Sequence, residues 1–596
     1  MSRRCSVALL AAACLMIAAP SAQAGWYPSE TVDGPADIVK VGGIDLARDG
    51  NGAVVYLRRE GGVAHVYVSR IFDGAFHSPE QVDAGIAEQA TDAAVAAADD
   101  HRLVVVWISG NRVYGSFIPG GSVGTLSPPQ LLADTSGPVR DVDVDMGING
   151  TAYATFTVPG AGGSDVAAVR LQGSTWEGVP QPLDVEPTRA AGVGAGRSRV
   201  AVSAEGNAVA TWGEEGAVFA RRITGLSVSL APQLVSDPSG GAADSPDIDI
   251  EDDGSFAWVV FRQELGTGPQ TVARRLVGSQ FEAPAIIGGP GSSAPAIAMD
   301  ERGFGEAVLA GGDGTVIAST LERDVFGVPF RLDASGGSEP QVAVSERQDI
   351  AVAWLFGDGQ VAGRYRSEDR RVQPQTLLSA PELGGVVPGS LRMASDRAGD
   401  DAVAMLQGDA GARRLTVAVY DRAPGAPFIY SSTRFQKRKR PELRWRGGLD
   451  LWGTPTYNVM VDRQLWGTSQ SPSFGVVRPL SEGVHRLRIV QIDRRGQSSL
   501  SRERFIRVDT APPRLRIKLR GKRRRGSTLK LTATALDGHG SGVNYVEIDW
   551  GDKSPRVRAA RASHRYRAGK FTLRVKAVDK VGNVSRRTVK LRIKKK

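Results

Sequence analysis

Two short runs of alternating acidic residues are the first candidates for a chemical site in this 596-residue sequence. The runs are Asp141, Asp143 and Asp145, and Asp247, Asp249 and Glu251. On a β-strand, residues two positions apart share a face, so each run would present several carboxylate oxygens to a hard cation such as Ca²⁺. The alternative is a polar strand face that alternates with buried Val and Ile, and it is favoured because Met146 interrupts the D-x-D-x-D-G pattern of a calcium loop.

The residue types and their spacing give little indication of a nucleophilic catalytic site or of a transition-metal site. Residues 120–124 read Gly-Gly-Ser-Val-Gly and fit the G-x-S-x-G string of a nucleophile elbow, but Pro128 and Pro129 follow too closely for a helix to begin. The six histidines show no metal-ligand spacing such as H-E-x-x-H. Both cysteines, Cys5 and Cys14, lie in a segment that we expect to be removed. The sequence therefore predicts no disulfide, no cysteine catalysis and no Cys-ligated metal.

Clusters of Lys and Arg near the end of the chain are candidate polyanion-binding residues. The clusters are Lys437, Arg438, Lys439 and Arg440; Lys522, Arg523, Arg524 and Arg525; and Lys594, Lys595 and Lys596. Residues 427–596 hold 42 Lys and Arg against 12 Asp and Glu, a formal charge of +30, whereas residues 1–426 carry −20. So basic a tail is expected to attract polyanions at low and moderate salt. One alternative is that these charges only solvate hairpin tips. Another is that the basic tail contacts the acidic residues of its own chain or of a neighbouring copy.

An internal repeat of about 50 residues predicts the elements that would position these side chains. A short apolar strand, a turn rich in Asp, Gly or Asn, and a second apolar strand recur at 44–56, 94–107, 142–156, 200–212, 248–261, 297–309, 342–354 and 391–405. Each copy is followed by further short strands, so one period supplies about four strands, the content of a propeller blade. The Ala-rich stretch 84–98 has helical propensity, but its alignment with the other copies predicts a strand.

A ring of such sheets would bury the faces that a single four-stranded sheet cannot bury alone. Residues 25–426 resemble secreted β-propellers with weak repeats, and we expect about eight blades, with seven as the alternative. Trp107, Trp212 and Trp354 recur at one position of the repeat, which favours packing over stacking on a sugar. The sialidase-type repeat S-x-D-x-G-x-T-W is absent.

Two different β-rich segments follow the repeats. Residues 427–510 alternate apolar and polar positions between turns and resemble immunoglobulin or fibronectin type III modules of bacterial surface proteins. Residues 511–596 resemble the polycystic kidney disease (PKD) domain, an extracellular sandwich, at Trp550, Gly551, Asp552, His564, Tyr566, Asp579, Gly582 and Asn583. They depart from that family at Lys553, where it usually has Gly.

The PKD resemblance implies a spacer, adhesion or carbohydrate-associated role and no catalysis. Asp552 and Asp579 are expected to accept hydrogen bonds from turn amides. Trp550, Tyr566 and Phe571 are expected to fill the core of the module.

Residues 1–24 have the order of a secretory signal peptide. Arg3 and Arg4 precede an apolar run over residues 7–19, and the small residues 22–24 (Ala-Gln-Ala) follow it. A lipoprotein signal with Cys14 as the lipidated residue is the alternative. No later stretch reaches the roughly 18 apolar residues of a membrane span. We therefore expect an extracellular protein, either free or associated with the cell surface.

These features together predict an all-β protein with a signal peptide (1–24), a β-propeller (25–426) and two β-sandwich modules (427–510 and 511–596). The function that we expect is non-catalytic binding or adhesion at the cell envelope, with the basic tail docked on an anionic envelope polymer or polysaccharide. No specific nucleic acid is expected, because no recognised nucleic-acid-binding motif is present. No cofactor is expected, Ca²⁺ in the acidic runs being the one candidate. The sequence leaves the oligomeric state open.

The alternative function is that of a secreted carbohydrate-active enzyme, a glycosidase or lyase, with its site on a propeller face. Carboxylates and aromatic rings at the mouth of the central channel would favour the enzyme. A channel plugged by small apolar side chains would favour the binding protein.

Overall fold

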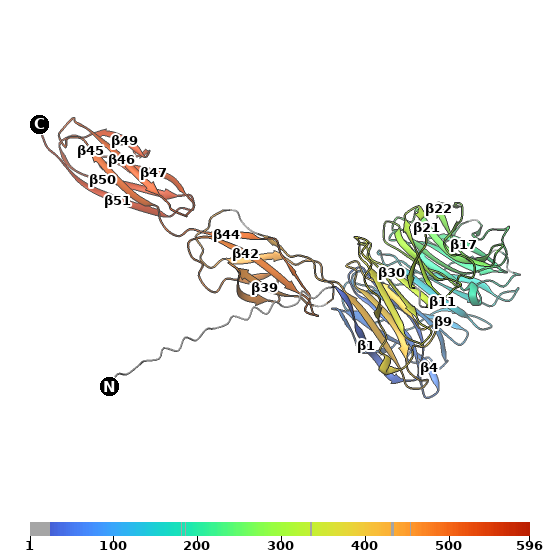
Figure 1. Cartoon of the computed structure of the whole chain (residues 1–596). Helices are drawn as coiled ribbons and strands as arrows, with labels where there is room; N and C mark the ends of the chain where they lie inside the picture. The colour runs from blue at the N-terminus through green and yellow to red at the C-terminus, as the bar shows by residue number, and fades with distance from the viewer. Residues whose placement is uncertain are drawn as a thin grey trace, which may run out of the picture. The chain divides into compact units, whose positions relative to one another are not determined.

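The computed structural model describes residues 24–179, 181–184, 186, 188–229, 231–333, 336–430, 434–452 and 454–595. The chain forms two compact units, which we name the ring unit (residues 23–422 with 451–453) and the C-terminal unit (described residues within 423–450 and 454–595). Apart from Ala24, the predicted signal peptide lies outside the described residues. The two helices of the described residues are three-residue turns, η1 (Gly194–Gly196) and η2 (Pro381–Leu383). The predicted all-β class is confirmed (Figure 1).

Within the described residues, the ring unit consists of eight antiparallel sheets, each built outward from an inner first strand. The first strands are β2 (Ile38–Leu46), β7 (Ala90–Ala98), β11 (Arg140–Met146), β15 (Arg199–Val202), β20 (Ala243–Ile250), β25 (Ala296–Met299), β30 (Ser338–Val344) and β34 (Arg392–Ser395). The second strands are β3 (Gly52–Glu60), β8 (Arg102–Ser109), β12 (Ala152–Val158), β16 (Asn207–Glu214), β21 (Phe256–Glu264), β26 (Phe304–Ala310), β31 (Ile350–Leu355) and β35 (Asp401–Gln407).

The third strands complete the regular part of each sheet, and shorter strands form most of the outer edges. The third strands are β4 (Val63–Phe72), β9 (Arg112–Ile118), β13 (Asp165–Gln172), β17 (Ala217–Thr224), β22 (Pro269–Val277), β27 (Val316–Glu322), β32 (Val361–Arg366) and β36 (Arg413–Asp421). The outer strands are β5 (Ala75–Phe76), β6 (Glu80–Gln81), β10 (Gln130–Asp134), β14 (Thr175–Gly178), β18 (Ser227–Val228), β19 (Gln233–Leu234), β23 (Gln280–Phe281), β24 (Ala285–Ile286), β28 (Val325–Phe326), β29 (Phe330–Asp333), β33 (Thr376–Leu377) and β1 (Gly25–Ala36).

The sheets close into a ring. Each first strand contacts the first strand of the next sheet, and β34 in turn contacts β2. The last sheet is completed by the N-terminal strand β1, which pairs with β36 so that Gly25 lies opposite Asp421 and Ala36 opposite Arg413. Two segments far apart in the sequence thus share one sheet.

Apolar side chains fill the spaces between neighbouring sheets. Trp107, Trp212 and Trp354 have no exposed surface. A fully buried ring cannot stack on a sugar, so their packing role is confirmed. The Ala-rich stretch forms strand β7, as the repeat predicts.

Leu451 and Trp452 belong to the ring unit, although the sequence places them inside the module 427–510. The buried Trp452 indole donates a hydrogen bond to Asp396 Oδ2 at 3.2 Å. Its ring lies edge-on to Phe76, with centroids 6.2 Å apart. The domain boundaries at 426 and 510 stay predictions.

The C-terminal unit contains two pairs of sheets. The first pair is formed by β37 (Phe428–Tyr430), β38 (Glu442–Arg446) and β41 (Ser473–Gly475), and by β39 (Thr456–Val461), β40 (Gln464–Ser469), β42 (Gly483–Ile492), β43 (Ser498–Leu500) and β44 (Arg504–Val508). The second pair is formed by β45 (Arg514–Arg520), β46 (Thr528–Leu536) and β49 (Arg561–Arg565), and by β47 (Val543–Asp549), β48 (Val557–Arg558), β50 (Gly569–Asp579) and β51 (Val584–Ile593). Each pair has its own cluster of buried apolar side chains. Among the described residues, no helix has the length and apolar character that a membrane crossing requires.

Candidate functional site

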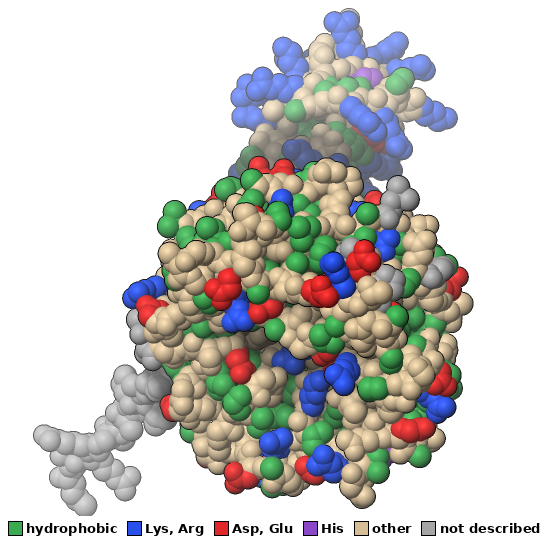
Figure 2. Space-filling view, turned by 90° about the vertical axis from the view of Figure 1, so that its right-hand side faces the viewer, with side chains coloured by type: hydrophobic (Ala, Val, Ile, Leu, Met, Phe, Trp, Pro, Cys, Tyr) green, Lys and Arg blue, Asp and Glu red, His purple; other side chains and the backbone are tan. Residues whose placement is uncertain are grey.

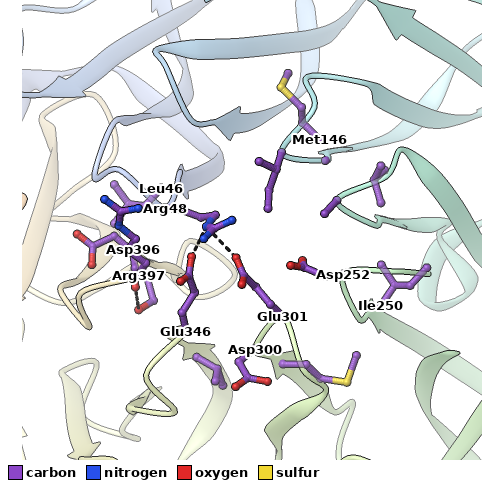
Figure 3. Close-up of a pocket in the computed structure, with 17 residues that line it drawn as sticks. Leu46, Arg48, Met146, Ile250, Asp252, Asp300, Glu301, Glu346, Asp396 and Arg397 are labelled. Carbon is purple, nitrogen blue, oxygen red and sulfur yellow. Dashed lines mark hydrogen bonds and ion pairs between the residues drawn. The ribbon is translucent and has the colours of Figure 1, made fainter. Parts of the chain in front are cut away.

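One end of the ring's channel is surrounded by the turns that follow the first strands, and we name this end the turn mouth. Its cavity has a volume of about 190 Å³. Arg48, Asp252, Glu301, Glu346 and Arg397 line it, each two residues after the end of its first strand (Figure 3). The repeat therefore places one side chain from each of five sheets around one cavity.

The carboxylates of the turn mouth share a cation. Arg48 Nε lies 2.7 Å from Glu301 Oε1, and Arg48 also forms an ion pair with Glu346. Burial, followed by the hydrogen bond with Glu346 and the nearby carboxylates, raises the pKa of Glu301 to about 8, while Arg48 opposes this shift. The raised pKa favours the protonated form of Glu301, which could donate a proton.

The floor of the turn mouth is apolar. It is formed by the last residues of six first strands, Leu46, Met146, Val202, Ile250, Met299 and Val344. Among the described residues, no aromatic side chain lines this cavity. The carboxylates of the turn mouth match what is expected of an enzyme, and its apolar floor without aromatic rings matches what is expected of a binding protein.

The other end of the channel, where the first strands begin, is lined by Arg197, Arg199 and Arg392, and we name it the arginine mouth. Its cavity has a volume of about 430 Å³. Arg199 lies 3.4 Å from Asp143 and 3.8 Å from Asp247. In Figure 2, Lys or Arg side chains lie beside a hollow near the middle of the visible face of the ring unit.

Two of these arginines have no carboxylate partner among the described residues. Arg392 donates hydrogen bonds to backbone carbonyl oxygens, including that of Gly42 at 3.3 Å, and Arg197 lies 3.5 Å from the carbonyl oxygen of Val142. Arg199 and then burial lower the pKa of Arg197. Burial, with Arg199 and Arg197, lowers the pKa of Arg392 to about 10. A bound anion would relieve this repulsion, because opposite charge favours the charged form of a guanidinium.

Two residues of each predicted acidic run lie on a first strand and bind the free edge of the next sheet, whereas Glu251 lies in the turn after β20 and accepts the amides of that turn. Asp143 and Asp145 accept hydrogen bonds from the Val200 and Val202 amides at 3.0 and 2.6 Å. In the second run, Asp247 and Asp249 accept them from the Ile297 and Met299 amides at 3.0 and 2.7 Å. Asp45, which sequence reasoning missed, binds the Ala97 amide in the same way at 2.7 Å. These carboxylates satisfy edge amides that have no ladder partner.

Calcium binding by the acidic runs, which begin at Asp141 and Asp247, stays a prediction. Among the described residues, three carboxylates approach closely enough to share one ion at Asp509, Asp537 and Asp579, outside both runs.

Two of the three predicted basic clusters meet in the C-terminal unit. The Lys594 amide donates a hydrogen bond to the Arg523 carbonyl oxygen, and the Arg525 amide donates one to the Lys594 carbonyl oxygen, both at 3.0 Å. The cluster 437–440 lies on another segment, where Lys439 forms an ion pair with Glu482 at 3.2 Å. All described members of the clusters are exposed, and Lys596 lies outside the described residues.

Sequence reasoning missed a larger basic surface, the outward side of the sheet β45-β46-β49, which we name the basic face. Its exposed cations are Arg514, Arg516, Lys518, Arg520, Lys530, Arg561 and Arg565. The three strands contain no Asp or Glu, and none of these cations forms an ion pair within the described residues. In register, Arg520 lies opposite Lys530 and Lys518 opposite Thr532. The signal was present in β45, whose sequence RLRIKLR puts a cation at every outward position.

The residues of the PKD-like motif form turns and core. Asp552 Oδ1 accepts a hydrogen bond from the Ser554 amide at 3.2 Å, and Asp552 Oδ2 lies 2.7 Å from His564 Nε2. Trp550 and Tyr566 are buried, and the Tyr566 hydroxyl donates to the Trp550 carbonyl oxygen at 2.9 Å. Gly551 has φ = +77°, and a Cβ there would lie 2.1 Å from the Thr572 carbonyl oxygen, so the motif requires glycine.

Two further motif positions depart from regular helix or strand backbone. Lys553, which replaces the family's glycine, has φ = +72°, a left-handed conformation that glycine adopts more easily. Ser122 of the G-x-S-x-G string is exposed in the loop between β9 and β10, where the described chain has no helix. The strand-to-helix turn of a nucleophile elbow is therefore not formed.

Comparisons with known proteins find no matching family model and no matching curated protein. Among solved structures, the chain is similar to the BP39L lectin from Burkholderia pseudomallei, at 12% identity and a TM-score of 0.41, over 59% of this chain and 100% of that one. The fungal Aleuria aurantia lectin, with a six-bladed β-propeller fold, matches at 12% identity and a TM-score of 0.32, over 55% of this chain and 94% of that one. The α-L-arabinofuranosidase Arb93A from Fusarium graminearum matches at 10% identity and a TM-score of 0.33, over 47% and 92%.

Proposed function

We propose that the protein is an exported, non-catalytic binding protein of the cell envelope that docks on an anionic polysaccharide through its basic face. In this proposal the ring unit is an eight-bladed β-propeller. The C-terminal unit then consists of an immunoglobulin- or fibronectin type III-like module and a PKD-like module, which place the protein on the polymer.

The observation that carries the proposal is the uncompensated charge of the basic face. Outward residues two apart on one strand are separated by about 6.8 Å, and neighbouring strands by about 4.8 Å. The four cations of β45 and those of β46 and β49 therefore form a regular grid without an acidic residue. Such a grid matches a polymer that carries a negative charge on each repeating unit, and release of counterions favours the association.

The composition of the basic face favours polysaccharide over nucleic acid. The outward positions between the cations carry Thr, Ser or Leu, such as Thr532, Thr534 and Ser563. Proteins that bind single-stranded nucleic acid usually stack bases on aromatic rings, and the described strands of this face present no ring outward. Hydroxyl groups between cations suit sugar hydroxyls and carboxylates.

The arginine mouth would hold a single carboxylate of the same class of polymer. Arg197 and Arg392 supply planar guanidinium groups, which bind carboxylates through paired hydrogen bonds. Its cavity of about 430 Å³ lies within the usual range of small-molecule sites.

The test is the binding of the full mature chain to polygalacturonate in two variants of equal net charge. Arg516→Glu/Lys518→Glu/Lys530→Glu reverses three cations of the basic face. Arg586→Glu/Lys590→Glu/Arg592→Glu reverses three exposed cations of β51. We expect the first variant to lose about 100-fold in affinity for polygalacturonate and the second to lose less than about 5-fold. The affinity of both variants should fall as the salt concentration rises.

Equal losses in the two variants would show that net charge alone drives binding, which would contradict a specific docking face. Neutral dextran should not bind. If duplex DNA binds as tightly as polygalacturonate and its binding depends on the basic face in the same way, the partner would be nucleic acid and not polysaccharide.

The alternative function, a carbohydrate-active enzyme, is favoured by one observation. Glu301 has a pKa raised to about 8 and lies beside the carboxylate of Glu346, a pairing that general-acid catalysis uses. Reducing-sugar release from the bound polysaccharides, lost in Glu301→Gln, would establish this activity. If the native protein releases no reducing sugar, the enzyme function is contradicted and the binding function stands.

A further inference from the structure

Three carboxylates meet in the C-terminal unit at turns that lie far apart in the sequence. Asp509 follows β44, Asp537 follows β46, and Asp579 is the last residue of β50. One carboxylate oxygen of each lies within 4.8 Å of those of the other two. The fold thus brings three formal negative charges together in a unit whose surface is strongly basic.

Asp579 has an oxygen that protein groups leave without a partner. Its side chain is completely buried, and Oδ1 accepts hydrogen bonds from the Val581 and Asn583 amides at 3.0 and 2.7 Å. Among the described residues, no group donates a hydrogen bond to its Oδ2, and the buried hydroxyl of Ser541 has no partner either. A buried carboxylate oxygen without a donor or a cation is unfavourable, so this arrangement suits a bound positive ion.

The other two carboxylates are held in place by the turn that contains Ser541. The Ser541 amide donates to Asp509 Oδ2 at 2.7 Å, and the Gly542 amide donates to Asp537 Oδ2 at 2.6 Å. Asp509 is only 1% exposed. These contacts fix the positions of the oxygens without neutralising their charge.

Side-chain cations do not balance the cluster. Among the described residues, no Lys or Arg forms an ion pair with any of the three carboxylates. Lys580 lies beside Gly542 and Lys437 beside Gly582, but neither forms an ion pair with the cluster within the described residues. Burial and the charges of Asp509 and Asp579 raise the pKa of Asp537, as expected where like charges crowd together.

The ligand atoms indicate which cation fits. The cluster offers carboxylate oxygens, and no His or Cys joins it within the described residues. Ca²⁺ accepts six to eight oxygen ligands in irregular geometry, whereas Zn²⁺ prefers nitrogen and sulfur and Mg²⁺ requires a near-ideal octahedron.

We propose that Asp509, Asp537 and Asp579 bind one Ca²⁺ ion, which fastens the segment after β44 to the turns that follow β46 and β50. This proposal is independent of polysaccharide binding. It concerns residues outside the acidic runs of the ring unit.

The experiment is isothermal titration of the EDTA-treated full mature chain with CaCl₂, compared with two variants. Asp537→Asn removes one charge at the half-buried position and keeps an oxygen that can accept the Gly542 amide. Asp549→Asn is the matched control, because Asp549 lies in the same pair of sheets and forms its ion pair with Arg574 at 3.7 Å, outside the cluster. A dissociation constant of about 10⁻⁴ to 10⁻³ M, the range of extracellular modules, is expected.

We expect the native chain and Asp549→Asn to bind one Ca²⁺ ion at this site with the same affinity. Asp537→Asn should either not bind that ion or bind it at least 10-fold more weakly. Mg²⁺ should bind at least 10-fold more weakly than Ca²⁺. Because Ca²⁺ would bind the folded state, 5 mM CaCl₂ should raise the melting temperature of the native chain more than that of Asp537→Asn.

Several results would overturn the proposal. One is the absence of saturable Ca²⁺ binding by the native chain up to 10 mM, and another is Ca²⁺ binding that Asp537→Asn leaves unchanged. If Asp537→Asn fails to fold, Asp509→Asn provides the second test, because it removes one charge and keeps an oxygen that can accept the Ser541 amide. Unchanged Ca²⁺ affinity in that variant would contradict the site.

Discussion

At the scale of single residues, Asp145 shows how a carboxylate can serve the fold where the sequence suggests a metal. Its Oδ2 accepts the Val202 amide at 2.6 Å and its Oδ1 accepts the Met146 amide at 2.7 Å. Asp145→Ala would leave both amides without their acceptor, and each buried unsatisfied donor costs about 1–3 kcal/mol. We therefore expect a loss of about 2–4 kcal/mol in the free energy of unfolding, measured by urea denaturation.

The control for Asp145→Ala is Asp134→Ala, since Asp134 forms an exposed ion pair with Arg112 at 3.0 Å and exposed pairs contribute little. The loss in Asp145→Ala should be the same with and without EGTA. A loss that appears only when Ca²⁺ is present would support the calcium prediction for the first acidic run.

At the scale of elements, strand β1 holds the last sheet of the ring unit together. It is the outer strand beside β36, and Trp26 lies edge-on to Tyr420 with ring centroids 5.4 Å apart. A variant without residues 25–36 would expose the edge of β36 and part of the apolar cluster behind it. We expect its melting temperature to fall by about 10 °C or more in calorimetry.

A synthetic peptide of residues 25–36, added to that variant, should raise the melting temperature again, because a ligand that binds the folded state stabilises it. A variant without residues 594–596 serves as the control for shortening the chain. A melting temperature unchanged by the loss of residues 25–36 would contradict the closure of the ring by β1.

The same scale shows which parts of the structure the sequence could predict. The pair of a first and a second strand was predictable in all eight sheets, because both strands and their turn are local and recur. The pairing of β1 with β36 was not predictable, since β1 carries no copy of the repeat and its partner lies almost 400 residues away. The arginine mouth was also missed, because Arg197, Arg199 and Arg392 meet only once the ring is closed.

The net charge of the C-terminal residues could be predicted from the sequence, but the surface on which the cations gather could not. The sequence indicates the runs at 437–440, 522–525 and 594–596 because their cations are consecutive. The basic face uses every second residue instead, so its cations are diluted in the sequence by the apolar residues of the opposite side. In β45 the cations recur at every second residue, and that period is the signal of the basic face in the sequence.

At the scale of the whole molecule, buried carboxylates of the ring unit should set the pH dependence of stability. Burial raises the pKa of Asp45 to about 6, of Asp145 to about 7 and of Asp249 to about 8. Burial also raises the pKa of Glu306 to about 7. In the unfolded chain these groups titrate near pH 4. The folded state therefore binds more protons than the unfolded state between about pH 4 and pH 8.

The stability that these groups contribute is fully present below about pH 4 and is lost as the pH rises through each folded-state pKa, by about 1.4 kcal/mol per pH unit for each group. We expect the melting temperature of the full mature chain, measured by calorimetry, to fall between pH 5 and pH 8.5. Asp249→Asn removes the group with the highest of these pKa values, so it should destabilise the protein more at pH 5 than at pH 8.5. A melting temperature that rises towards pH 8.5 would mean that these carboxylates are ionised in the folded ring, with the edge amides outweighing the cost of burial.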